Sequence, residues 1–144
     1  MTYVMTNYIA DARSLTDPVQ AGEVFDDAVH DILGHGRCGQ SFWIKPEGGE
    51  EDLRIDIDIE VGRAMLTWLS DNTIGVELEP GPPLLIEWSV DAATLTLPGT
   101  LARVSAATAR RAVVEYVTTG ERPTCVEWAA EPGIAVLPSE MFRP

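Results

Sequence analysis

Five carboxylates are the residues of this chain best placed to do chemistry together, because each lies in a short stretch where apolar and polar residues alternate. They are Asp56, Asp58, Glu77, Glu79 and Glu87. Such alternation is typical of a β-strand with one buried and one exposed face. If the strands that carry them are neighbours, the five carboxylates share the exposed face of one sheet. Like charges facing one another across strands lower stability, which favours a functional explanation, although an acidic protein also exposes its carboxylates wherever strand exteriors allow it.

Carboxylates gathered on one face could bind a cation, catalyse acid–base chemistry or dock a basic surface. Asp56 and Asp58 point to the same side of their strand, but any alternating acidic strand has that geometry. The chain contains no Gly-x-Ser-x-Gly elbow, phosphate-binding loop, His-Glu-x-x-His motif or zinc-deaminase signature. We therefore expect no catalytic residues and favour docking to a basic groove, such as the cleft of an enzyme that acts on nucleic acid.

A metal site is the other chemistry that the sequence suggests, because His30, His35 and Cys38 are close in sequence and Cys125 could be a fourth ligand. Each histidine also has an ordinary explanation. His30 follows Asp26 by four residues on the exposed side of a predicted helix, and His35 lies near the end of that helix, where a cation is favoured. We expect no metal and no cofactor, and we expect both cysteines to be reduced thiols.

The charge of the chain limits its partners. With 23 acidic and 10 basic residues, the formal net charge is -13. Nucleic acid and anionic membranes would be repelled, so we expect neither as a direct partner and a basic protein instead. No apolar run is long enough to cross a bilayer, and the first residues lack the features of a signal peptide. These observations predict a cytoplasmic protein with a single domain over residues 1–144.

Periodicity predicts the elements that position the carboxylates. Asp17 and Pro18 open a helix whose apolar face runs from Val24 to Leu33. A strand precedes it over 2–10, and from residue 40 the period changes to two. The predicted strands cover 41–45, 53–59, 63–69, 73–79 and 84–90, with edge pieces at 94–97 and 134–137. Their short, turn-rich connections favour a meander. All four tryptophans lie in predicted strands and are expected to pack in the core.

Residues 103–128 contain the clearest local signals. Ser105 is a good N-cap, apolar residues from Ala106 to Val117 follow at helical spacing, Gly120 ends the helix, and Pro123 prevents it from resuming before a strand over 124–128. The expected fold is α+β, an antiparallel meander sheet backed on one face by two helices.

The same stretch carries a resemblance to a known family. The matching residues are Val104, Ser105, Tyr116, Thr119, Gly120, Arg122, Pro123, Thr124, Val126, Glu127 and Trp128. A looser match over 53–89 includes Trp68, the turn at 70–72 and Gly75. With these residues the chain resembles bacterial immunity proteins encoded beside deaminase-type toxins in polymorphic toxin loci, mostly in actinobacteria. Such proteins inhibit a toxin and have no catalytic residues, so the resemblance implies binding and supplies no active site.

Three hypotheses follow from the residues and the resemblance. The first is an immunity protein that occludes the active-site cleft of a cognate toxin, a basic deaminase domain. The five carboxylates are its expected contacts, together with Asp71 and Asn72 in a turn and Glu127, which should point away from Trp128. The second is an acidic adaptor or secretion chaperone for a basic effector, which would leave the effector active. The third is an enzyme that uses the strand carboxylates.

Overall fold

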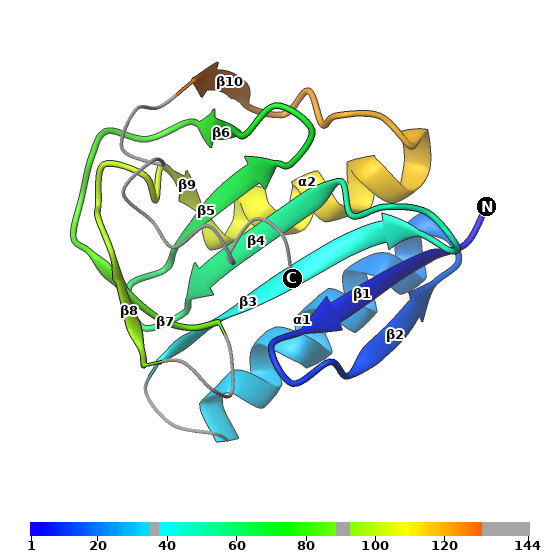
Figure 1. The fold of residues 1–144 in the computed structure, drawn as a ribbon, viewed down its shortest axis with the longest axis horizontal. Helices are drawn as coiled ribbons and strands as arrows, with labels where there is room; N and C mark the ends of the chain where they lie inside the picture. Colours follow the sequence, from blue (N-terminus) through cyan, green and yellow to red (C-terminus); the bar gives the residue numbers. More distant parts are fainter. Residues whose placement is uncertain (35–37, 89–92, 131–144) are drawn as a thin grey trace.

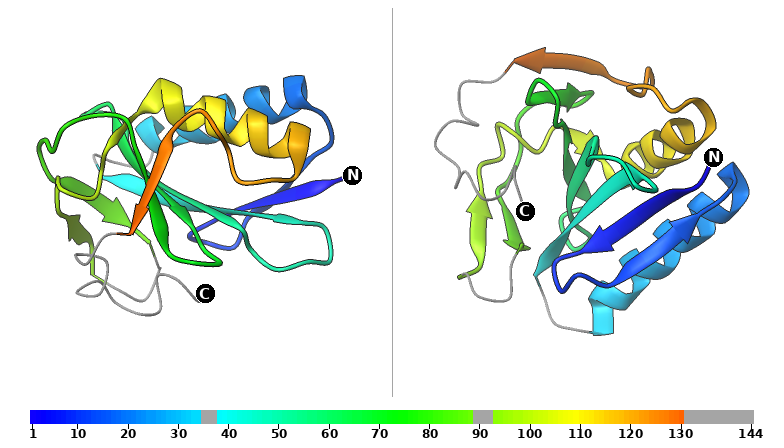
Figure 2. Two further views of the ribbon diagram at one scale, coloured as in Figure 1. Left: turned by 90° about the horizontal axis from the view of Figure 1, so that it is seen from above. Right: turned by 45° about the vertical axis from the view of Figure 1, so that its right-hand side comes forward.

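The fold is a large sheet with two helices packed on one of its faces (Figure 1). The computed structural model describes residues 1–34, 38–88 and 93–130. In chain order the elements are β1 (Tyr3–Asn7), β2 (Ala12–Leu15), α1 (Pro18–Gly34), β3 (Gly39–Pro46), β4 (Leu53–Asp58), β5 (Arg63–Trp68), β6 (Thr73–Val76), β7 (Leu84–Glu87), β8 (Leu95–Leu97), β9 (Val104–Ser105), α2 (Ala106–Thr119) and β10 (Glu127–Ala130). Figure 2 shows α1 and α2 side by side on the same side of the sheet. The expected α+β class is confirmed.

The centre of the sheet is the expected meander. Strands β3, β4, β5 and β6 are neighbours in chain order and pair antiparallel. The full path is β10-β6-β5-β4-β3-β1-β2, so β10 and β2 form its two edges. The four predicted strands between residues 41 and 79 are therefore confirmed, although β6 ends at Val76, three residues earlier than expected.

Strand β7 does not extend the meander, and this part of the prediction is wrong. It pairs in parallel with the start of β3, where Gly39 lies opposite Ile86, and antiparallel with β8. The connection after β6 contains Pro80, Pro82 and Pro83, which lack the N–H donors that a continued ladder would need. The backbone N–H groups of Glu77 and Leu78 both donate to the carbonyl of Arg103 instead, at 2.9 and 2.8 Å.

The first expected strand is in fact a hairpin. Strand β1 ends at Asn7, whose side-chain Oδ1 accepts hydrogen bonds from the N–H groups of Ile9 and Asp11 at 3.1 and 2.9 Å. Ala10 adopts a φ of 62°, which completes the reversal into β2. Asparagine favours such turns because its short amide can bond to backbone two or more residues ahead. The turn places Tyr8 and Ile9 at the tip of the hairpin.

Both helices begin where the sequence indicates, and α2 also ends at the expected residue. Asp17 caps α1 by accepting from the N–H of Gln20 at 2.9 Å, and Gln20 in turn accepts from the N–H of Thr16 at 2.7 Å. Ser105 caps α2 by accepting from the N–H of Thr108 at 3.1 Å. Gly120 ends α2 with a φ of 71°. Residues with side-chain acceptors at the start and glycine at the end satisfy helix-end groups that would otherwise lack partners.

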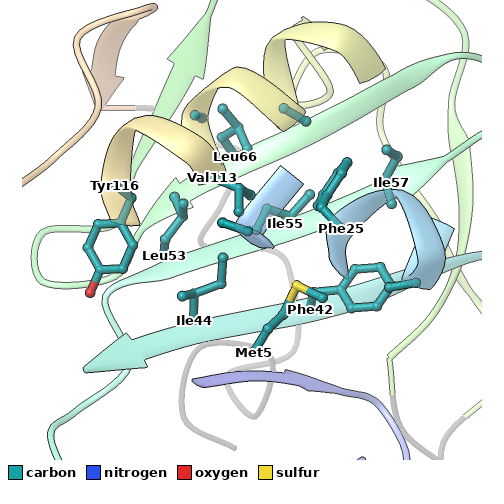
Figure 3. Packing of buried hydrophobic residues seen from close by; sticks show 14 of the residues in the cluster. Met5, Phe25, Phe42, Ile44, Leu53, Ile55, Ile57, Leu66, Val113 and Tyr116 are labelled. Carbon is teal, nitrogen blue, oxygen red and sulfur yellow. The ribbon is translucent and has the colours of Figure 1, made fainter. Parts of the chain in front are cut away.

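The main core lies between the helices and the sheet (Figure 3). Leu53, Ile55 and Ile57 of β4 are all fully buried in it, as predicted. The Tyr116 ring of α2 makes edge-on contacts with Tyr3 and Trp68, with ring centroids 5.0 and 5.8 Å apart. Burying such large rings supplies much of the free energy that holds α2 on the sheet.

A second apolar cluster forms around β7 and β8. Its buried members are Met65, Ile74, Leu84, Ile86, Leu97, Leu101 and Ala102. Trp68 and Trp128 pack against the first cluster and Trp88 packs against the second, whereas Trp43 is buried outside both. Their expected packing role is confirmed. The expected strand at 134–137, the end of the strand at 84–90 and His35 lie outside the described residues.

Candidate functional site

Asp56, expected on an exposed face, is fully buried. Its carboxylate accepts two hydrogen bonds at 2.9 Å from the Arg54 guanidinium, one from Nε and one from Nη2. The Ser41 hydroxyl donates a third at 2.5 Å, and the guanidinium lies 4.7 Å from the centre of the Trp43 ring. A buried carboxylate requires such charged and hydrogen-bonding partners. Asp56 is therefore part of an internal polar cluster and is not available to a docking partner.

Asp58 is also buried, with 5% of its surface exposed, so its expected exposure is wrong too. One carboxylate oxygen accepts from the N–H of Glu60 at 3.1 Å, and the other accepts from the N–H of Leu85 at 3.3 Å. These bonds connect the β4–β5 turn to β7. Because β7 crosses to β3 rather than continuing the meander, it closes over this end of β4, and Asp58 becomes a structural link.

Glu77 is exposed as expected, but its carboxylate binds the start of α2. It accepts from the N–H of Ser105 at 3.0 Å and from the Thr108 hydroxyl at 2.6 Å, and Arg111 lies 3.5 Å away. Partial burial raises the pKa of Glu77, but the hydrogen bonds from Thr108 and Ser105 outweigh it, so the net pKa lies below the ordinary value. Negative charge at a helix N-terminus is favourable, so Glu77 has a structural role of its own. Thr108 itself is fully buried.

Four of the expected contact residues lie in or next to β6 and β10, namely Asp71, Asn72, Glu79 and Glu127. Asp71 accepts from the N–H of Thr73 at 3.1 Å and pairs with Arg122 at 3.3 Å. Asn72 holds the turn with a φ of 54°. The other two members, Glu79 and Glu127, are exposed. We name the set Asp71, Asn72, Glu79 and Glu127 the β6–β10 surface.

Glu87 lies apart from that surface, at the end of β7. It is opposite Gln40 of β3 in the parallel register, and its carboxylate interacts with the Tyr8 hydroxyl at the tip of the β1–β2 hairpin. Desolvation raises the pKa of Tyr8, and the charge and hydrogen bonding of Glu87 raise it further. The single acidic face expected from the sequence is thus divided among an internal cluster, the start of α2, the β6–β10 surface and the end of β7.

A pocket beside Glu87 is the feature that sequence reasoning missed. It has a cavity volume of about 100 Å³ and opens between the hairpin, α1 and the start of β3. Its lining consists of Met5, Asn7, Tyr8, Ile9, Asp11, Arg13, Ala28, Asp31, Gln40 and Phe42. No spacing connects these residues, because they come from β1, β2 and the turn between them, from α1 and from β3, which the pairing of β1 with β2 and β3 brings together.

Exposed apolar side chains lie at the hairpin tip, which lines this pocket, and on β7. Ile9 at the hairpin tip is 54% exposed, and Leu85, two residues before Glu87 on the same face of β7, is 47% exposed. Few large apolar side chains in the described part of the chain are as exposed as these. We name the set Tyr8, Ile9, Asp11, Leu85 and Glu87 the hairpin–β7 surface. It combines apolar contact area with carboxylates, which is the composition of a protein-binding surface.

The metal ligands suggested by the sequence are not gathered in the described residues. Within 1–34, 38–88 and 93–130, no group of three or more His, Cys, Asp or Glu side chains is arranged to hold a metal ion. Cys38 and Cys125 are half-buried free thiols. Burial raises the pKa of Cys125, and the nearby carboxylate of Glu115 raises it further. In the part of the chain that the structure describes, no helix is long and apolar enough to cross a membrane.

Comparison with known proteins assigns the chain to a family. A family model described as immunity protein Imm1 matches residues 7–130. The match includes every element from β2 to β10 and the whole pocket except Met5. No curated protein matches the chain.

Proposed function

Because the chain belongs to the Imm1 family of immunity proteins, we propose that it binds a cognate toxin and neutralises it by covering the toxin's active-site cleft. The family match is the observation that carries this function, since it spans nearly the whole fold. The proposed toxin is a deaminase-type enzyme with a basic cleft, as the resemblance of residues 104–128 implies. The protein would act in the cytoplasm, by binding alone and without catalysis.

Charge supports the choice of a basic partner. The chain has a formal net charge of -13, and an enzyme that acts on nucleic acid needs a positive cleft for its substrate. An acidic protein that occupies this cleft competes with the substrate and is drawn to it by long-range attraction. Such an inhibitor needs no active site of its own.

The hairpin–β7 surface is the proposed docking site. Binding energy at interfaces is concentrated in a few apolar or aromatic anchors surrounded by polar groups, and this surface offers Ile9 and Leu85 beside Asp11 and Glu87. Other expected contacts are already used within the fold. Asp56 and Asp58 are buried, and Glu77 accepts hydrogen bonds at the start of α2, so their substitution would change folding before it changed binding.

Inhibition of the toxin encoded by the adjacent gene tests the function directly. Purified chain added to that toxin should abolish deamination of its nucleic-acid substrate at a one-to-one ratio. An adaptor or chaperone would instead bind the toxin and leave it active, and this result would contradict the proposal. Turnover by the immunity protein alone would point to an enzyme.

A pair of matched double variants tests the docking site. Asp11→Asn with Glu87→Gln removes two charges from the hairpin–β7 surface, and Glu79→Gln with Glu127→Gln removes two from the β6–β10 surface. Only the first should slow association, on the order of tenfold at low ionic strength, because steering depends on charges near the contact. Stopped-flow mixing measures both rates. If the second variant is the slower one, the β6–β10 surface marks the contact instead.

A further inference from the structure

We propose that the pocket between the hairpin and α1 receives a basic side chain of the toxin, a lysine or an arginine, as an anchor of the complex. This inference rests on the proposed function, because it names what part of the toxin this surface recognises. It is drawn from the polar, charged and apolar groups around the pocket.

Gln40 provides an unused polar group inside the pocket. The residue is 95% buried, since 5% of its surface is exposed, and it lines the cavity. Within the described residues no hydrogen bond joins its side-chain amide to a partner. Its amide atoms are not among the fully buried polar atoms that lack a partner, so the amide keeps contact with solvent in the pocket, where an entering group would replace water. Its carbonyl oxygen is therefore available to accept from an ammonium or guanidinium group that enters.

The charges around the pocket favour a cation over an anion. Asp11 and Asp31 line it, and Glu87 lies opposite Gln40 in the register of β7 and β3. Arg13 pairs with Asp31 at 2.9 Å, so it offsets one of the three carboxylates. The Asp11 carboxylate is exposed and makes no ion pair among the described residues. An incoming cation would thus meet a net negative charge at the mouth.

The walls of the pocket suit the rest of a basic side chain. Met5, Ala28 and Phe42 are buried apolar residues that line it. Lysine and arginine bury their methylene groups along apolar surface, and their charged ends are attracted to aromatic faces such as that of Phe42. A cavity of about 100 Å³ admits one side chain and is too small for a nucleotide or a folded peptide.

A test without the toxin uses two small molecules, one that imitates a basic side chain and one that is its neutral analogue. Butylguanidinium and the neutral butylurea have similar shapes and differ in charge. In NMR titrations of isotope-labelled protein, butylguanidinium should shift the signals of the Gln40 side-chain amide and the Ala28 methyl group, and butylurea should not. Equal shifts with both molecules would overturn the inference, because they would show a pocket with no preference for a cation.

Two pocket variants extend the test to the complex. Ala28→Leu fills the cavity, and Gln40→Met removes the hydrogen-bonding amide while keeping the side-chain length. Ala107→Leu, the same change as the first on the exposed side of α2, is the matched control. Thermal unfolding of each variant identifies any that fails to fold. Both pocket variants should lose the butylguanidinium shifts and raise the Kd for the toxin by about tenfold or more, whereas the control should match the wild-type protein.

The outcomes separate this inference from the proposed function. If both folded pocket variants bind the toxin with the wild-type Kd, the pocket is not an anchor, although inhibition of the toxin stands. If the wild-type protein does not bind the toxin at all, the proposed function fails, and the toxin anchor fails with it. A pocket that still distinguishes butylguanidinium from butylurea would then keep its preference for a basic side chain, to be matched to another protein.

Discussion

Asp56 is stable inside the sheet because Arg54, two residues earlier on the same strand, supplies the opposite charge. Side chains two apart on a strand point to the same face, so the guanidinium reaches the carboxylate without any bend in β4. Ser41, directly across on β3, adds a hydroxyl donor. Three residues on two strands thus form one hydrogen-bonded unit.

Breaking this unit should destabilise the protein strongly. Asp56→Asn removes the carboxylate that faces the buried Arg54 guanidinium, and loss of one partner of a buried pair costs about 3–5 kcal/mol. The exposed Glu79→Gln is the control and should change the free energy of unfolding little. Urea unfolding followed by tryptophan fluorescence measures both. Equal effects would mean that the cluster contributes no more than a surface charge.

Glu77 should make the free energy of unfolding depend on pH under acidic conditions. Its pKa is lowered in the folded protein from an ordinary value of 4.5, so it contributes stability that is fully present above this value and is lost as the pH falls through the lower folded pKa. The difference in unfolding free energy between wild type and Glu77→Gln should be constant near neutral pH and shrink below about pH 4.5. Urea titrations across that range provide the measurement. A difference that grows on acidification would contradict the stabilising role of Glu77 at the start of α2.

The individual carboxylates show where sequence reasoning at a single position reaches its limit. Alternation placed Asp56 correctly on the face opposite Leu53, Ile55 and Ile57, but it could not show that this face is covered as well. Arg54 between apolar neighbours was the available signal, because a cation and an anion on the same strand face can be buried as a pair. The roles of Glu77 and Glu87 depend on contacts with residues more than twenty positions away, which no local pattern contains.

Helix α2 is the element whose limits follow most directly from sequence, because its signals are local. Ser105 and Gly120 act through backbone groups within one turn of the helix, so their effects need no knowledge of the rest of the fold. The hairpin and β7 are different. The hairpin depends on the Asn7 side chain in a stretch that otherwise reads as one strand, and the position of β7 depends on a parallel pairing that short turns did not suggest.

Gly120→Val should destabilise the protein through two effects at the end of α2. A β-branched residue is strained at a φ of 71°, and a Cβ there would approach the Tyr3 hydroxyl to 2.8 Å. The expected loss is about 1–3 kcal/mol from backbone strain, with any clash in addition. Glu121→Val places the same side chain at the next, exposed position and is the matched control. Chemical unfolding of the two variants should separate them clearly, and equal losses would contradict the assigned helix end.

At the scale of the whole molecule, apolar packing and net charge have different effects. The two helices and the apolar clusters determine the fold, whereas the net charge of -13 bears on association with other molecules. The α+β class was predictable because it depends on periodicities repeated over many residues. The pocket was not, since its lining comes from the two strands of the hairpin, from α1 and from β3. A site assembled from four elements becomes visible only when their arrangement is known.

Salt should therefore affect the free protein and its complex in opposite directions. Carboxylates on one small molecule repel one another, so raising NaCl from about 20 mM to about 300 mM should increase the thermal unfolding temperature of the free chain by screening that repulsion. The same change should slow association with a basic toxin, because it screens the attraction that guides the encounter, and should change dissociation little. Calorimetry gives the first result and stopped-flow mixing the second. An association rate that is independent of salt would mean that the complex forms through apolar contact alone, and the acidic surface would then have no part in finding the toxin.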